Sequence, residues 1–236
     1  MSGSLGPLGW AWPRNIAGNA IGWGADGVTL ANIPMESRNL YYFDAVGDGV
    51  TDDTDAVQAA FDWVAGGGLA GRALNITSGQ YLLLDKVSVT VPNHTTVALH
   101  GSGGQAGTIL VGNATGGIEL LCSGSAPFVT VEKFAIVPAM AGAGFLLRVK
   151  GTYSGSGGGI GHNTVVVRDM EFSPLQRTTS TYYSLNPLDF EKMKRPYIER
   201  IVYRPGTQAP AYYGDYLVNL SDCYSPVIKD YVLGGY

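Results

Sequence analysis

The chain has 236 residues, a formal net charge of −4, 45% hydrophobic residues and only 14% charged residues. This composition argues against intrinsic disorder, because enough apolar surface can be buried to offset the chain entropy. No basic tract indicates nucleic-acid binding, and the longest uncharged apolar stretch, Phe134–Leu147, is too short to span a bilayer. We therefore expect a soluble protein that neither binds nucleic acid nor inserts into a membrane.

Residues 1–38 differ from the rest of the chain, because they hold three of the four tryptophans among many glycines and show no helical or strand period. Trp10, Trp12 and Trp23 are costly to leave in water and are typical of binding hot spots. We interpret this segment as an extended arm that docks onto a partner. A leader without structure of its own is the alternative.

A single helix is predicted after a short strand at Leu40–Phe43. Its apolar face is formed by Val57, Ala60, Phe61 and Val64, which follow helical spacing. Acidic residues in the first turn interact favourably with the positive N-terminal end of the helix dipole. The predicted turn and cap comprise Gly47, Asp48, Gly49, Thr51, Asp52 and Asp53.

From residue 72 onward the pattern is one of short strands separated by turn residues. The first of these are Ala73–Ile76, Gln80–Leu84, Val87–Val91, Thr96–Leu99 and Thr108–Val111. A weak repeat follows, which aligns Val131, Val167, Ile198 and Ile228 at spacings of about 30 to 36 residues. A partner strand precedes each aligned copy.

A repeat of this length that is made of strands and turns is typical of a β-solenoid. The 34 glycines fit an all-β chain with many turns. We expect an all-β right-handed parallel β-helix that has an N-terminal capping α-helix and an extended N-terminal arm. The expected divisions are the arm (1–38), the entry strand and capping helix (39–71) and a shaft (72–236) that continues beyond the chain. An antiparallel sandwich is the alternative.

The stretch Phe43–Ala60, with its Gly-Asp-Gly-Val-Thr-Asp-Asp-Thr core, resembles the entry motif of pectate-lyase-like right-handed β-helix proteins. The arm ahead of the motif, and the absence of the catalytic motifs of polygalacturonases, resemble the bacteriophage tail-spike branch of that family. The resemblance implies a homotrimer of the virion tail, made in the host cytoplasm, whose arm contacts other tail or baseplate proteins. It also implies binding, and possible depolymerisation, of a bacterial surface polysaccharide.

Glycoside cleavage needs two carboxylates that flank the scissile bond. Asp189 and Glu191 lie on either side of Phe190, so both point away from the core if Phe190 points inward. Asp215 and Asp222 follow about one repeat later and complete the catalytic candidates. Surface polarity, which needs no catalysis, is the alternative explanation for all four residues.

Tyrosines crowd the last quarter of the chain, and their rings and hydroxyl groups suit sugars. The loop tyrosines Tyr182, Tyr183, Tyr212 and Tyr213 are the glycan-binding candidates, whereas Tyr203 fits a core or a trimer interface. A non-catalytic structural or adaptor component of the tail, and a free polysaccharide lyase or hydrolase, are the alternative functions.

No cofactor and no metal site is predicted, because three scattered histidines and no Cys-x-x-Cys pattern make a zinc site improbable. Cys122 and Cys223 are expected to be small buried apolar residues rather than disulfide partners.

Overall fold

The computed structural model describes residues 36–103, 107–124, 127–152, 164–173, 183–184, 186–203 and 217–233. All of these residues belong to one compact unit, Glu36–Tyr236. The predicted arm therefore lies outside the described residues except for its last three positions, and so do Trp10, Trp12 and Trp23.

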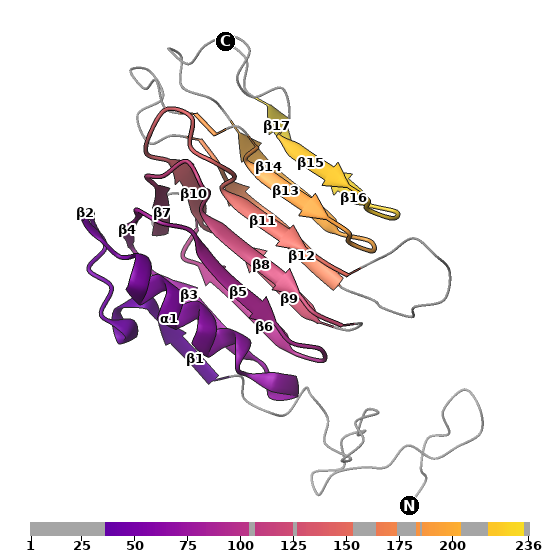
Figure 1. Cartoon of the computed structure of the whole chain (residues 1–236), viewed down its shortest axis with the longest axis horizontal. Helices are drawn as coiled ribbons and strands as arrows, with labels where there is room; N and C mark the ends of the chain where they lie inside the picture. Colours follow the sequence, from indigo (N-terminus) through magenta and orange to yellow (C-terminus); the bar gives the residue numbers. More distant parts are fainter. Residues whose placement is uncertain are drawn as a thin grey trace, which may run out of the picture. The chain divides into compact units, whose positions relative to one another are not determined.

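Parallel strands form two sheets (Figure 1), and every strand pair among the described residues is parallel. The larger sheet has 12 strands and is curled, with the central path β1-β3-β6-β9-β12-β10-β7-β4-β2. Strand β14 extends it from β12, and β16 and β17 follow β14. The strands of this curled sheet are β1 (Glu36–Asn39), β2 (Asp48–Asp52), β3 (Arg72–Ile76), β4 (Gly79–Leu83), β6 (Thr96–Gly101), β7 (Gly107–Val111), β9 (Phe128–Glu132), β10 (Ala135–Pro138), β12 (Thr164–Glu171), β14 (Tyr197–Tyr203), β16 (Val227–Lys229) and β17 (Val232–Leu233).

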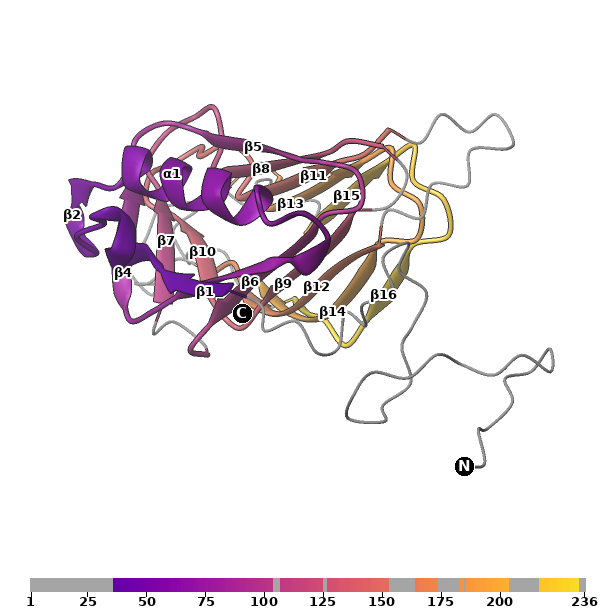
Figure 2. The same ribbon diagram turned by 90° about the horizontal axis from the view of Figure 1, so that it is seen from below.

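The smaller sheet has five strands in the order β15-β13-β11-β8-β5. It faces the curled sheet across the core (Figure 2). Its strands are β5 (Val87–Val91), β8 (Ile118–Cys122), β11 (Leu147–Lys150), β13 (Leu188–Glu191) and β15 (Val218–Ser221).

The predicted fold class, an all-β right-handed parallel β-helix, is wrong. The nine strands of the central path form one curled parallel sheet, a half-barrel, and with one α-helix the arrangement is α/β-like rather than a solenoid. The cause is strand β12, which pairs with β9 along its first half and with β10 at Glu171. It therefore joins the series β1-β3-β6-β9 and the series β10-β7-β4-β2 into one sheet. A sequence repeat predicts parallel pairing in register, but it does not determine how the paired strands are joined into sheets.

The predicted alignment of the repeat is confirmed. Val131 is the Cα partner of Val167, Val167 of Ile198, and Ile198 of Ile228. The first three of these side chains are fully buried. Because side chains alternate between the two faces of a strand, this register places one apolar row of each repeat in the core.

The predicted helix is present as α1 (Thr54–Ala65), with its residues Val57, Ala60, Phe61 and Val64 buried. The segment Leu40–Phe43 is a 3₁₀-helix, η2, and not the predicted strand, which lies instead at β1. A second short 3₁₀-helix, η3, spans Gly68–Ala70.

Of the residues predicted to cap the helix, Asp52 accepts a hydrogen bond from the backbone N–H of Thr54, the first residue of α1 (3.0 Å), while others order the segment before it. Asp53 precedes α1 without capping it, and its carboxylate accepts hydrogen bonds from the backbone N–H groups of Val46 (2.6 Å) and Gly47 (3.1 Å). Asp48 binds Thr51 in the same way (2.7 Å). Both carboxylates therefore order residues 46–51, the segment around β2 that leads into α1.

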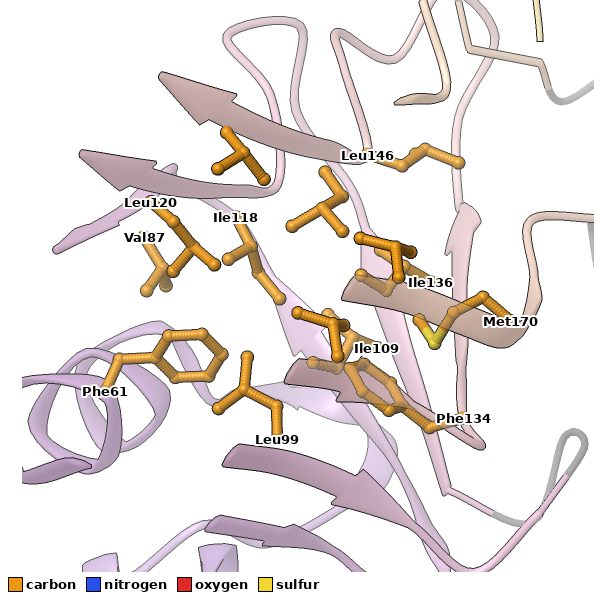
Figure 3. Packing of buried hydrophobic residues seen from close by; sticks show 14 of the residues in the cluster. Phe61, Val87, Leu99, Ile109, Ile118, Leu120, Phe134, Ile136, Leu146 and Met170 are labelled. Carbon is orange, nitrogen blue, oxygen red and sulfur yellow. The ribbon is translucent and has the colours of Figure 1, made fainter. Parts of the chain in front are cut away.

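The core lies between the two sheets and α1. Figure 3 shows Phe61 of α1, Leu120 of the smaller sheet and Ile109 of the curled sheet converging on one apolar cluster. All three side chains are fully buried. Burial of such side chains contributes about 1.5–3 kcal/mol each, so this cluster holds the helix and both sheets together.

Cys122 and Cys223 are unpaired, as predicted, and Cys122 is buried. Burial raises the pKa of the Cys122 thiol to about 12, so it remains protonated. In the described part of the chain, no helix combines the length and apolar character needed to cross a membrane.

Candidate functional site

A pocket of about 520 Å³ opens beside β1, β3 and β6 of the curled sheet. The side chains of Leu74 and Leu99 are fully buried. Since side chains alternate along a strand, Asn75 and His100, which follow them, point away from the core. The lining residues are mostly polar and include one aromatic ring: Ser37, Arg38, Asn39, Tyr42, Asn75, Thr77, His100, Gly101 and Ser102.

One wall of the pocket is formed by Tyr42, whose side chain is 62% exposed. The turn of η2 places it there, because the Asn39 side chain accepts a hydrogen bond from the Tyr42 backbone N–H (3.1 Å). The Arg38 guanidinium lies 4.1 Å from the Tyr42 ring centroid and 4.7 Å from that of Trp63. Cation–π contacts at exposed sites contribute about 0.5–1 kcal/mol, so they favour this orientation of the exposed ring.

A row of ionisable groups runs across neighbouring strands from His100, the one member of the row that lines the pocket. His100 and Glu132 are Cα partners on β6 and β9, and Arg168 follows on β12. His100 Nδ1 lies 2.8 Å from Glu132 Oε1, and the Arg168 guanidinium donates a hydrogen bond to the other carboxylate oxygen of Glu132. Glu132 is only 4% exposed, whereas His100 lines the pocket.

Glu132 is ionised in this arrangement. Burial raises the pKa of its carboxyl, but the hydrogen bond and the charge of Arg168, together with His100, outweigh burial and lower the pKa. The ionised carboxylate accepts a hydrogen bond from Nδ1–H of His100, so Nε2 is the ring nitrogen left for other partners. This assignment follows from the hydrogen-bond partners.

The pocket thus offers an exposed ring and several neutral hydrogen-bonding groups. Asn75 donates to Ser37 Oγ (2.7 Å), so these two side chains are held in place. Rings and convergent polar groups of this kind suit a sugar or another polyhydroxylated ligand. Among the described residues, no group of three His, Cys, Asp or Glu side chains could hold a metal ion.

The catalytic candidate Asp189 lies on the outer face of the smaller sheet. Leu188 and Phe190 are fully buried, so Asp189 points away from the core as expected, but it is only 6% exposed. Arg148 Nε donates to its Oδ2 (2.7 Å), and Asn219 Nδ2 donates to its Oδ1 (3.0 Å). Its two carboxylate oxygens therefore both have partners.

Glu191 has its own cations, Lys150 (2.9 Å) and Lys192 (3.5 Å). The hydrogen bond from Lys150 is the main cause of the lowered pKa of Glu191, and it outweighs burial, which raises the pKa. A lowered pKa does not suit a general acid, which must hold a proton near neutral pH. Asp222 is exposed in the turn after β15, and Asp215 lies outside the described residues.

Of the tyrosines predicted to bind glycan, Tyr182, Tyr212 and Tyr213 lie outside the described residues. Tyr183 is half-buried, and its backbone carbonyl accepts a hydrogen bond from the Ala143 N–H (3.1 Å). It does not line the pocket.

The pocket residues are not predicted as a site from the sequence. Tyr42 falls in the segment predicted as a strand, and His100 has its partner Glu132 on a strand 32 residues away. A signal was present in the repeat, because Glu132 and Arg168 occupy the same position in two aligned copies and carry opposite charges.

No protein-family model and no curated protein matches this chain. Among solved structures, ORF18 of Geobacillus virus E2 has 17% sequence identity and a TM-score of 0.40, over 83% of this chain and 48% of the viral protein. A candidate glycosyl hydrolase from Parabacteroides merdae has 11% identity and a TM-score of 0.41, over 84% of this chain and 96% of that protein. The chain thus spans about half the length of the viral protein. Both TM-scores are too low to establish a shared fold or activity.

Proposed function

We propose that this chain binds a bacterial surface polysaccharide as part of a bacteriophage tail spike, and that the pocket beside Tyr42 and His100 holds a sugar unit. The observation that carries the proposal is the exposed Tyr42 ring, in contact with Arg38, beside polar groups in a pocket of about 520 Å³. A volume of this size accommodates small ligands. The resemblance of Phe43–Ala60 to the tail-spike entry motif supports the choice of polysaccharide as the ligand.

In this proposal the exposed part of the Tyr42 ring packs against an apolar face of the sugar. Asn75 and His100 hydrogen-bond the sugar hydroxyls, His100 through Nε2. As in the sequence resemblance, we propose a homotrimer whose residues 1–38 attach it to the virion. The pocket is assigned a binding role, because no pair of unpaired carboxylates lines it.

The direct test measures binding of purified bacterial surface polysaccharides to immobilised protein. Tyr42→Ala and His100→Ala are each expected to weaken binding about tenfold, which corresponds to about 1.4 kcal/mol. Tyr231→Ala is the matched control, because Tyr231 is also exposed (55%) but lies outside the pocket.

Two results would contradict the proposal. The first is binding that survives both pocket substitutions unchanged. The second is a loss of binding in Tyr231→Ala equal to that in Tyr42→Ala. Chain-length analysis of the polysaccharide after incubation tests depolymerisation separately, since cleavage would require an activity beyond the proposed binding.

A further inference from the structure

The apolar row of the curled sheet is uncovered at its last strand. Val131, Val167 and Ile198 are fully buried, whereas their aligned partner Ile228 is 38% exposed. Because the register is unchanged, Ile228 points where the other three point, and no strand among the described residues pairs on its far side.

The smaller sheet ends in the same way. Val149 and Phe190 are fully buried, and Leu220, the Cα partner of Phe190, is half-buried. We call β15, β16 and β17 together the terminal edge. Large apolar side chains are exposed on and beside it: Tyr224 (49%), Val227 (37%), Ile228 (38%), Tyr231 (55%) and Val232 (44%).

The strands of the terminal edge also have a free backbone side in the described part of the structure. There β15 pairs with β13, while β16 and β17 pair with β14. An edge with unpaired N–H and C=O groups and apolar side chains is a template for an added strand.

Charges beside the apolar row specify which strand fits. Each copy carries two successive charged residues of opposite sign, and their order alternates from copy to copy: Glu132-Lys133, Arg168-Asp169, Glu199-Arg200 and Lys229-Asp230. Opposite charges therefore meet between neighbouring copies. Arg168 pairs with Glu132, and Arg200 Nη2 donates to Asp169 Oδ2 (2.8 Å).

Like charges that lie directly opposite each other on neighbouring strands are destabilising. A strand added beyond β16 must therefore place an acidic residue opposite Lys229 and a basic residue opposite Asp230. It must also place an aliphatic residue opposite Ile228.

We propose that the terminal edge docks a parallel strand pair, from a polypeptide segment beyond these 236 residues, with the pattern aliphatic–acidic–basic–aliphatic at the position of Ile228 to Tyr231. The segment Ile198-Glu199-Arg200-Ile201 shows that this pattern forms such a strand within the fold. Strand β1 of a second copy does not fit, because its register places Arg38 in the apolar row of Leu74, Leu99 and Val131.

The test appends a copy of residues 186–203, which comprises β13 and β14, after Tyr236 through a flexible Gly/Ser linker. Tethering gives the copy a high effective concentration, so a weak contact is still detected. Hydrogen exchange of the β16 backbone amides in the full chain is the readout. The matched copy is expected to slow this exchange at least about tenfold.

The control copy carries Glu199→Arg and Arg200→Glu within the appended segment only, and it is expected to protect β16 roughly five- to tenfold less. Lys229→Glu with Asp230→Lys in the body of the chain should restore protection by this control copy. Unchanged exchange with the matched copy would overturn the proposal, and so would equal protection by both copies. A third outcome is that the chain without any appended copy sediments as a dimer whose β16 amides already exchange slowly. That result would assign the terminal edge to a second copy of the chain and would also overturn the proposal.

Discussion

Gln58 and Ser88 exchange two hydrogen bonds, in the way that paired strands do. Gln58 Nε2 donates to the Ser88 carbonyl (3.0 Å), and the Ser88 N–H donates to Gln58 Oε1 (3.0 Å). Ser88 lies on β5, the first strand of the smaller sheet, and α1 packs beside it (Figure 2). A helix side chain thus takes the place of a neighbouring strand and closes this edge to further pairing.

Replacing Gln58 with Leu should therefore lower the free energy of unfolding by about 1–3 kcal/mol, because the polar groups of Ser88 lose their partner. Gln58→Glu should also be destabilising, since the carboxylate still accepts the Ser88 N–H but loses the donor to the Ser88 carbonyl and to Asp62 Oδ1 (3.0 Å). Urea unfolding measures both changes. Ala59→Leu, on the exposed side of α1, is the control and should be nearly neutral. Equal losses for the Leu substitutions at 58 and 59 would exclude this role of Gln58.

The sequence predicted α1 and the register of the repeat because both follow from local apolar periodicity. Strands β3 to β7 were predicted to within two residues for the same reason. Local periodicity could not predict how the strands are joined into two sheets. Strand β12 continues through Asp169, which has a positive φ (55°), and no glycine in the sequence marks that bend.

The candidate site was less predictable than the fold elements. Alternation around Phe190 correctly predicted that Asp189 points outward. Its partner Arg148 lies 41 residues earlier, so the ion pair appears only once the register is known. Tyr42 gave no sequence signal, since the turn of η2 that exposes it depends on the Asn39 cap.

Tyr203 offers a test of burial without a hydrogen bond. It is 2% exposed, its hydroxyl has no hydrogen-bond partner among the described residues, and burial raises its pKa to about 12. Tyr203→Phe should leave the free energy of unfolding unchanged or raise it by about 1 kcal/mol. Tyr81→Phe is the matched control and should be destabilising, because the Tyr81 hydroxyl lies 3.2 Å from Thr77 Oγ1. Thermal unfolding compares the two variants, and a destabilised Tyr203→Phe would show that the hydroxyl is satisfied.

Stability should fall in acid. Burial raises the pKa values of Glu119 and Glu132, but contacts with Lys86 and Ser88 for Glu119, and with Arg168 and His100 for Glu132, outweigh burial and lower them. A carboxyl whose pKa is lower in the folded state stabilises the protein fully above its ordinary value of 4.5. That contribution is lost as the pH falls through the lower folded-state pKa. Urea unfolding should therefore show decreasing stability below about pH 5, and a constant midpoint down to pH 3 would contradict this.

The alternating charges can be tested by exchange. Asp169 and Arg200 pair between β12 and β14 at partly exposed positions, so Asp169→Lys should lower the free energy of unfolding by about 0.5–1 kcal/mol. Adding Arg200→Asp should recover most of the loss. Urea unfolding of both single variants and the double variant gives the coupling. Additive losses in the double variant would show that the charge order is not what matters.

Substitutions of Glu132 and His100, which are paired across β6 and β9, should affect stability and polysaccharide binding differently. Glu132→Gln removes the buried anion, but the Arg168 guanidinium is 42% exposed and stays solvated, so the free energy of unfolding should fall by about 1–2 kcal/mol. His100→Gln keeps a donor for Glu132 but changes the group that faces the pocket. It should cost little stability while weakening polysaccharide binding about tenfold. Thermal unfolding and binding measured on the same preparations provide the comparison. Stability loss in His100→Gln equal to that in Glu132→Gln would make His100 a structural residue and remove it from the proposed binding site.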